Sequence, residues 1–400
     1  VNAPASDSAP AVTAGLSVTD ESVRTQINDT AKREVIVSIP SDATEQSIAA
    51  DLSLLSKLAE KSKNLVISND AVNISFPPGA VSSEQISRAG ENSMLKVSIE
   101  KLNSRQAGEK VSLPQNEGNS GLFMVGGSIF QFNAEIASSN KNTAITSFTS
   151  PVTISISLED IDIGGIDTDK LGVYYYNEAT KSWEYVGGTF DAATNSISFD
   201  TMHFSYYTVM ECKRTFNDIT THWARSYIEK MAAKQIAKGH TGNNFLPESS
   251  ISRAEFTAVL VRALQLKDSQ DSKSAFTDIK AGKWYETEAN KAYSAGLIRK
   301  EDGVNFRPDV AITREEMAVM IVRALQYKGL GLGFNEEQIN SKLAAYDDSA
   351  EITPNAREAF VIAIEKGIIK GRTVSTVAPK GTATRAEAMV MIYRLLGIKG

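Results

Sequence analysis

The chain has one cysteine, Cys212, among its 400 residues, which excludes an intramolecular disulfide framework. It also lacks any uninterrupted apolar run near the ~18 residues that a membrane helix needs, so we expect no membrane insertion. A charged-then-apolar signal peptide is missing too, although the small, polar opening at 1–10 resembles an N-terminus left after cleavage. This opening favours a mature, secreted protein.

Residues that build active sites are equally scarce. There are three histidines, none at a metal-ligand spacing, and we find no Gly-x-Ser-x-Gly motif or phosphate loop. The acidic stretch 159–169 does not follow the calcium-loop pattern, so we interpret it as a solvated turn. We interpret the Gly-rich stretch 329–333 as a linker. The sequence therefore predicts a binding protein, without metal or cofactor, rather than an enzyme.

Charge is unevenly distributed along the chain. The formal net charge is −6, with acidic residues dominating 1–214 and basic residues slightly exceeding them in 215–400. Neither imbalance is strong enough to predict nucleic-acid binding. The change in composition, together with the length, instead indicates a multidomain chain.

The first half reads as a mainly-β module behind a leader. Residues 1–34 are rich in Ala, Ser, Thr and Asp without apolar periodicity, and we expect a flexible leader there. Between 35 and 210, short alternating runs separated by turn residues predict strands and favour an antiparallel sandwich. One helix is predicted inside this module, at about Glu45–Ser62.

The second half contains an internal threefold repeat, with copies at 211–270, 271–332 and 333–400. Each copy has an aromatic-x-Asp start, a helix, a Gly-containing turn, a loop and a second, strongly apolar helix. The loop, which we call the x-Pro loop, contains Phe245-x-Pro247, Phe306-x-Pro308 or Val377-x-Pro379. One copy is too small to bury its own core, so the three copies should fold as one body around a central three-helix bundle.

A four-residue motif precedes each apolar helix. Its copies are Ser252-Arg253-Ala254-Glu255, Thr313-Arg314-Glu315-Glu316 and Thr384-Arg385-Ala386-Glu387. The hydroxyl and the Glu predict a capping box, because each can satisfy a free N–H of the first helical turn. The Arg stands where the helix dipole favours negative charge. Its recurrence predicts three sites that receive an anion, the alternative being a salt bridge to the Asp of the same copy.

These residues resemble the S-layer homology (SLH) domain of bacterial cell-surface proteins, in a set of three. The resemblance rests on the aromatic-x-Asp start, His222-Trp223, Lys283-Trp284, the x-Pro loop and the Arg-containing motif, and covers roughly 216–396. It implies an all-α, pseudo-threefold trimer whose grooves bind secondary cell-wall polysaccharide, often through pyruvylated N-acetylmannosamine. The protein would then be a non-covalent cell-wall anchor.

The resemblance also implies roles for particular residues. The motif arginines would contact the pyruvate carboxylate in a bidentate manner. The aspartates would accept bonds from sugar hydroxyls or orient the arginines, and the tryptophans would offer an apolar face to a sugar, unless they are core. The implied ligand-binding set is Arg253, Arg314, Arg385, Asp218, Asp278, Asp348, Trp223, Trp284, Gly239 and Gly371.

The copies are not equivalent. Glu315 adds a negative charge beside the second motif, and the third copy has no Trp counterpart. The first copy has Gln235 where the others have a turn glycine, and the second has Lys300 where the others have Gly239 and Gly371. We therefore expect the three grooves to bind unequally, the first best and the third least.

Two other functions remain open for residues 35–210. The module could be a polysaccharide-degrading enzyme that the repeats anchor, or it could self-associate into a surface lattice. The tripeptide His203-Phe204-Ser205 also matches a self-cleavage site of some sandwich modules, with Ser205 as nucleophile and His203 as base. We interpret it as part of an ordinary final strand.

Overall fold

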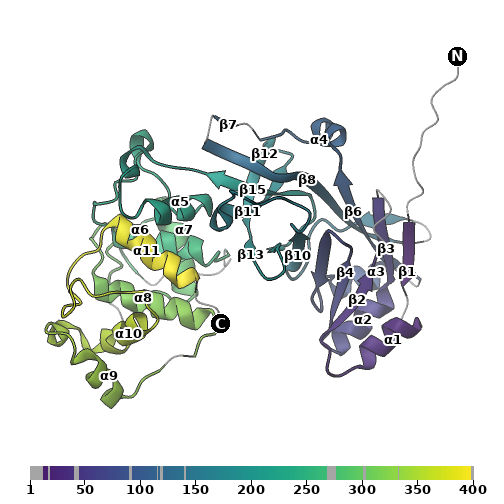
Figure 1. Cartoon of the computed structure of the whole chain (residues 1–400). Helices are drawn as coiled ribbons and strands as arrows, with labels where there is room; N and C mark the ends of the chain where they lie inside the picture. The colour runs from purple at the N-terminus through teal and green to yellow at the C-terminus, as the bar shows by residue number, and fades with distance from the viewer. Residues whose placement is uncertain are drawn as a thin grey trace. The chain divides into compact units, whose positions relative to one another are not determined.

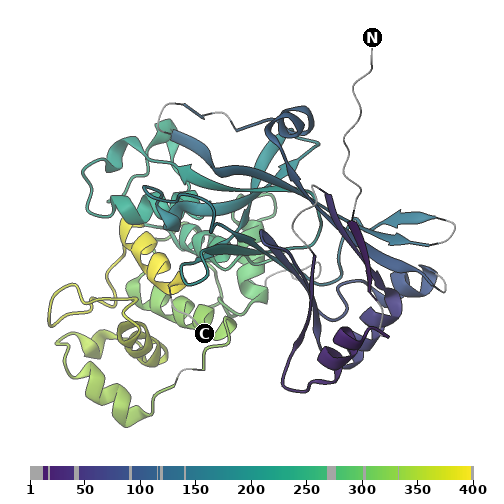
Figure 2. The same cartoon turned by 45° about the vertical axis from the view of Figure 1, so that its right-hand side comes forward.

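The computed structural model divides the chain into two compact units, Val1–Lys213 and Arg214–Gly400. Both units are drawn in Figures 1 and 2, and each is described by itself. The described residues are 12–16, 19–39, 45–89, 92–114, 116–117, 120–138, 141–267, 276–300, 303–331 and 333–397. Residues 1–11 and 17–18 of the expected leader, and the expected boundary between the first two repeats at 270/271, lie outside them.

Two β-sheets form most of the N-terminal unit. The first sheet has the strand order β1-β3-β6-β8-β15-β11-β12, with β7 and β9 also paired to β8. Its strands are β1 (Val12–Leu16), β3 (Glu45–Asp51), β6 (Met94–Leu102), β7 (Asn116–Glu117), β8 (Ser120–Ala137), β9 (Asn142–Ala144), β11 (Leu171–Asn177), β12 (Ser182–Gly187) and β15 (Tyr206–Lys213).

The second sheet has the order β13-β14-β10-β5-β4-β2. Its strands are β2 (Glu34–Ser38), β4 (Asn64–Ser68), β5 (Val72–Phe76), β10 (Val152–Ser157), β13 (Thr189–Asp191) and β14 (Ser196–Thr201). Alternation in the sequence explains these strands: Val152, Ile154 and Ile156 of β10 are buried while the residues between them are less so. Apolar side chains of both sheets belong to one hydrophobic cluster. The prediction of a β-rich module is confirmed.

The helices of this unit differ from the prediction. They are α1 (Glu21–Asn28), α2 (Leu52–Glu60), α3 (Ser83–Ala89) and α4 (Ser104–Lys110). The helix predicted at Glu45–Ser62 is wrong in its first half, which forms strand β3 between β1 and β6. A strand that is buried on both faces has consecutive apolar residues instead of alternating ones, so its sequence can be mistaken for that of a helix. Asp51 then caps α2 by accepting from the Ser53 N–H.

Part of the expected flexible leader is ordered. In α1, Val23 and Ile27 are four residues apart and both are buried, which is the apolar spacing that the sequence reading overlooked. The Gln26 side chain of the same helix both donates to the Ile36 carbonyl and accepts from the Ile36 N–H. Because β2 lies at the edge of its sheet, Gln26 occupies the position that another strand would take.

The C-terminal unit is helical, as predicted. Its helices are α5 (Arg225–Ala233), α6 (Arg253–Ala263), α7 (Glu286–Ser294), α8 (Arg314–Tyr327), α9 (Glu336–Leu343), α10 (Pro354–Glu365) and α11 (Arg385–Leu396). The second helix of each copy packs against the first helix of the next copy: α6 on α7, α8 on α10, and α11 back on α5. Backbone bridges Ser252–Ala311, Thr313–Thr382 and Ser250–Thr384 join the copies in the same order. The contacts therefore close a ring.

The three predicted capping boxes are present. Ser252, Thr313 and Thr384 accept from the backbone N–H of the motif Glu, whose own carboxylate accepts from the N–H of the hydroxyl residue. Each box satisfies two N–H groups that the first turn of the helix would otherwise leave without a partner. These starts fix where α6, α8 and α11 begin.

We predict that Gln235→Gly stabilises the C-terminal unit by about 0.5 kcal/mol. Gln235 has φ 58°, in the turn where the other copies place Gly296 (φ 70°) and Gly367 (φ 67°), and a side chain is strained there. The converse change Gly367→Ala should destabilise this unit by about 1 kcal/mol through backbone strain at positive φ. No other atom lies near the added methyl group, so steric contact adds nothing to this cost. Calorimetry of the whole chain would measure both, and equal midpoints for the two variants would contradict the prediction.

Candidate functional site

The motif arginine of each copy reaches into the next copy around the ring. Arg385 of the third copy donates from Nε to the Phe245 carbonyl (2.9 Å), from Nη1 to Glu255 Oε1 (2.7 Å) and from Nη2 to the Lys238 carbonyl (3.1 Å). Its guanidinium also lies over the Phe245 ring, 4.8 Å from the centroid. Three of its N–H groups are thus bound to first-copy atoms.

The other two arginines repeat this arrangement. Arg314 donates from Nε to the Val377 carbonyl (2.9 Å) and from Nη2 to the Lys370 carbonyl (2.5 Å), both in the third copy. Arg253 pairs with Glu316 of the second copy (3.3 Å) and lies over the Phe306 ring. Arg253 and Arg314 are buried, and burial lowers the pKa of Arg314. The predicted alternative of a salt bridge to the Asp of the same copy does not describe these contacts, and anion binding by the motif arginines stays a prediction.

The motif glutamate completes the link between copies. Glu255 accepts from the Ser252 N–H with one oxygen and from Arg385 with the other. Glu316 does the same with Thr313 and with two arginines, Arg253 and Arg307. For Arg253 and Arg385, the charge at the first helical position is therefore balanced by a carboxylate of the neighbouring copy, which offsets its unfavourable position on the helix dipole.

The three aspartates hold the x-Pro loop of their own copy. Asp218 accepts from the Phe245 and Leu246 N–H groups, one with each carboxylate oxygen. Asp278 and Asp348 make the same pair of bonds in their copies. The second residue held in this way has positive φ in every copy: 58° at Leu246, 59° at Arg307 and 49° at Ala378. The carboxylate stabilises a strained turn, a role that the sequence alone did not indicate.

Gly239 and Gly371 are required by close backbone packing. A Cβ on Gly239 would stand 2.6 Å from the Phe216 ring, and one on Gly371 would stand 2.4 Å from the Thr373 carbonyl oxygen. Either contact is closer than atoms tolerate, so these glycines shape the loop that forms one wall of the groove. Trp223 and Trp284, by contrast, are 61% and 57% exposed, so neither indole belongs to the core.

A groove of 450 Å³ lies beside the first copy, and we call it groove 1. All three copies contribute to it: the loop 237–240 and helix α6 from the first, Trp284 and Asp309 from the second, and Arg385 and Met389 from the third. Trp284 therefore belongs to the first copy's groove rather than to its own. The sequence could not show this, because the assignment depends on which copy follows which around the ring.

The corresponding groove beside the second copy, groove 2, has a volume of 350 Å³. It is lined by Arg253, Glu315, Glu316, Val319, Met320, Arg323, Thr353, Asn355 and Ala356. No aromatic residue is among them. Glu315, expected to add a free negative charge, is buried and accepts from Lys380 Nζ (2.6 Å) and from the Thr353 N–H (3.1 Å). Its charge is compensated by the third copy.

A second recurring arginine lies nine residues after the first. Arg262, Arg323 and Arg394 each donate from Nη1 to a backbone carbonyl in the turn after the first helix of their own copy. Arg262 also lies 3.6 Å from Glu288. These contacts tie the two helices of a copy together, and burial lowers the pKa of Arg262.

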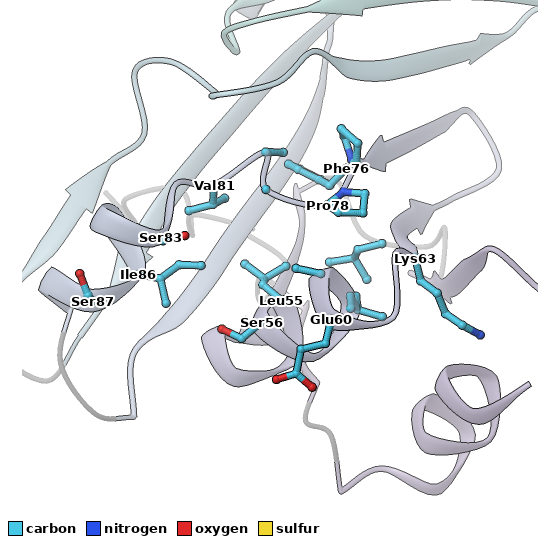
Figure 3. Close-up of a pocket in the computed structure, with 16 residues that line it drawn as sticks. Leu55, Ser56, Glu60, Lys63, Phe76, Pro78, Val81, Ser83, Ile86 and Ser87 are labelled. Carbon is cyan, nitrogen blue, oxygen red and sulfur yellow. The ribbon is translucent and has the colours of Figure 1, made fainter. Parts of the chain in front are cut away.

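The N-terminal unit has a cavity of its own, of 360 Å³. Figure 3 shows it between α2, α3 and the loop that follows β5, with Leu55, Phe76, Pro78, Val81 and Ile86 around it. The side chain of Lys63 points away from this cavity and donates to the Gln26 and Asp29 carbonyls. The cavity walls are mainly apolar.

The tripeptide 203–205 lies just before β15. Ser205 Oγ donates to the Tyr176 carbonyl (3.4 Å), and the His203 carbonyl accepts from Thr201 and Tyr207. The Phe204 ring packs against Phe148, with 4.8 Å between centroids. These contacts fit a structural role and give the Ser205 hydroxyl no base, although the expected strand begins only at Tyr206.

Among the described residues, no helix has the length and apolarity to cross a membrane. The same part of the chain contains no cluster of three His, Cys, Asp or Glu side chains suited to a metal ion.

We predict that Arg385→Met destabilises the C-terminal unit by about 2 kcal/mol, because it leaves the mostly buried Glu255 and two carbonyls without their donor. Arg372→Met is the matched control: Arg372 also pairs with a motif Glu but is 42% exposed, so its loss should cost under about 1 kcal/mol. Thermal unfolding of the whole chain would compare them. Equal losses of stability in the two variants would mean that the bonds of Arg385 to the first copy stabilise the unit no more than the exposed Arg372 ion pair does.

Glu316 predicts a pH dependence of stability. Burial alone would raise its pKa, but the Thr313 N–H and the charges of Arg253 and Arg307 lower it below the ordinary 4.5. A lowered pKa in the folded state stabilises the fold above the ordinary value, and this stabilisation is lost as the pH falls below it. The unfolding midpoint should thus drop between pH 7 and about pH 4 more steeply in the natural chain than in Glu316→Gln. Parallel curves of unfolding midpoint against pH for the natural chain and Glu316→Gln would contradict this prediction.

Comparison with known proteins identifies the C-terminal unit. The family model of the S-layer homology domain matches residues 215–257, 275–318 and 345–389. An amylopullulanase of Thermoanaerobacterium thermosulfurigenes is 40% identical over 250 residues, 62% of this chain and 13% of the relative. That alignment is longer than the C-terminal unit and so extends into the N-terminal one.

One further relative is named as a surface-layer protein and another as an anchoring protein. A surface-layer 125 kDa protein of Lysinibacillus sphaericus is 27% identical over 45% of this chain and 14% of the relative. A cellulosome-anchoring protein of Acetivibrio thermocellus is 30% identical over 34% of this chain and 32% of the relative. The chain thus spans less than a third of the length of these three relatives. Residues 215–389 carry three S-layer homology domains, and the chain is a secreted protein of the bacterial cell surface.

Proposed function

We propose that the chain is held non-covalently on the cell wall by its three S-layer homology domains, which bind secondary cell-wall polysaccharide. The observation that carries the proposal is groove 1, where an exposed indole, Trp284, faces a wall that contains the cations Lys238, Arg262 and Arg385. An indole offers an apolar plane to the C–H face of a sugar, and cations suit an acidic substituent.

We propose further that the polymer carries a carboxylate, such as the pyruvate ketal that the family resemblance implies. In this proposal the ring of contacts between copies is a pseudo-threefold trimer around the second helices. The motif arginines and the aspartates act mainly by fixing the groove walls, through the bonds to neighbouring loops described above. A ligand then meets a preformed surface, which lowers the entropic cost of binding.

The grooves are unequal in this proposal. Groove 1 and groove 2 each have two acidic side chains, but groove 1 combines them with Trp284 and three cations, whereas groove 2 has two arginines and no aromatic residue at its wall. We therefore assign tighter binding to groove 1. By the ring order, this proposal assigns Trp223 to the groove beside the third copy, so that groove has an indole although the third copy contains no Trp of its own.

A second function is supported for the whole protein by the names of its relatives. The amylopullulanase and an endoglucanase of a Bacillus strain, 34% identical over 45% of this chain, are glycosidases with a similar C-terminal part. The second candidate function is therefore an anchored polysaccharide-degrading enzyme, with residues 35–210 proposed as the module that carries the activity. Turnover assays of the whole chain on starch, xylan and cellulose distinguish this from a chain that only anchors, since sugar release requires catalysis.

We predict that Trp284→Ala weakens binding of the whole chain to purified wall sacculi about tenfold, because a sugar loses its apolar partner. Tyr327→Ala is the matched control, since Tyr327 is 54% exposed but lines neither groove. Its binding should equal that of the natural chain in a sedimentation assay. If the natural chain binds sacculi from which the polysaccharide was stripped, the proposed function is wrong.

A further inference from the structure

The three cations of groove 1 have different surroundings. The Arg385 guanidinium is hydrogen-bonded to Phe245, Glu255 and Lys238, and Arg262 donates to the Ile236 carbonyl beside Glu288. Lys238 is exposed, and among the described residues its ammonium makes no hydrogen bond or ion pair. Of the three, only Lys238 therefore keeps all its N–H donors available to a ligand.

The position of Lys238 is fixed although its side chain is exposed. Its carbonyl accepts from Arg385 Nη2, and the following Gly239 lies so close to the Phe216 ring that the loop cannot move inward. The charge of Arg262, and then partial burial, lower the pKa of Lys238, while Glu288 acts in the opposite sense. A lowered lysine pKa indicates a positive local potential, which an incoming anion would neutralise.

From this geometry we infer that Lys238 is the residue of groove 1 that binds the anionic group of a cell-wall glycan, while the sugar beside that group lies on Trp284. The inference rests on the proposed function and deepens it. It assigns the anion to a lysine of the loop rather than to the motif arginine, whose donors hold the loop in place. A lysine acts as a compact point charge, so it accepts a carboxylate or a phosphate without requiring a bidentate geometry.

The second copy lacks this arrangement. Its counterpart of Lys238 is Arg299, whose Nε donates to the Gly296 carbonyl, and neither Arg299 nor Lys300 lines groove 2. Groove 2 has Arg253 and Arg323 but no lysine among its lining residues. The third copy is similar to the first, because the Lys370 carbonyl accepts from Arg314 as the Lys238 carbonyl accepts from Arg385. Anion binding is thus specific to copies with a lysine before the loop glycine.

The test compares Lys238→Gln with Lys366→Gln in the whole chain. Lys366 is an exposed lysine at the end of α10 and lines neither groove, so its loss changes net charge equally. Binding to purified sacculi at low salt should weaken about tenfold, or about 1.4 kcal/mol, in Lys238→Gln and stay unchanged in Lys366→Gln. Raising the salt concentration should reduce binding of the natural chain more than binding of Lys238→Gln.

Chemical treatment of the sacculi distinguishes the two sources of negative charge. Carbodiimide amidation neutralises carboxylates, and hydrofluoric acid removes phosphodiesters. The treatment that reduces the natural chain to the level of Lys238→Gln, without weakening the variant further, identifies the group. If Lys238→Gln binds as well as Lys366→Gln while Trp284→Ala is impaired, the inference is overturned and the proposed function stands. If the natural chain does not bind sacculi, both are overturned.

Discussion

The ion pair between a motif arginine and the motif glutamate of the next copy is the contact on which the C-terminal unit depends. It joins two helix starts, since the Arg follows one capping residue and the Glu completes the other capping box. The pair occurs at the link from the first copy to the second and at the link from the third copy to the first, while Arg314 donates to two carbonyls of the third copy. Partly buried charges are costly unless they are paired, so the pairing favours the closed ring over isolated copies.

Local features of this unit could be predicted from the sequence because they depend on residues close together in the chain. The capping boxes, the apolar second helices and the x-Pro loops follow from short-range spacing. The partners of Arg385 could not be predicted, because Phe245 and Glu255 are more than a hundred residues away in the sequence. The sequence of a single copy also does not determine the order in which the copies follow one another around the ring. The role of Asp218 was not predicted because sugar hydroxyls were the donors expected for its carboxylate, whereas two backbone N–H groups donate to it in a turn with positive φ.

In the N-terminal unit, local sequence patterns predicted some secondary-structure elements and failed to predict others. Strands with clear alternation, such as β10, were predictable, but β3 is buried on both faces and its small apolar residues have no period of two. Helix α1 was overlooked because only two of its residues, Val23 and Ile27, face the core, and its remaining residues are polar. In both cases tertiary packing, rather than local preference, determines the secondary structure.

Because groove 1 is built from three copies, no copy can change independently of the others. Arg385 is a wall of the first copy's groove, yet it starts the helix of the third, and Trp284 belongs by sequence to the second. A substitution in one repeat is therefore felt in the groove beside another, and the three repeats are expected to diverge as a coordinated set. Each repeat contributes side chains to both groove 1 and groove 2, so exchanging a single repeat between such proteins would alter both grooves at once.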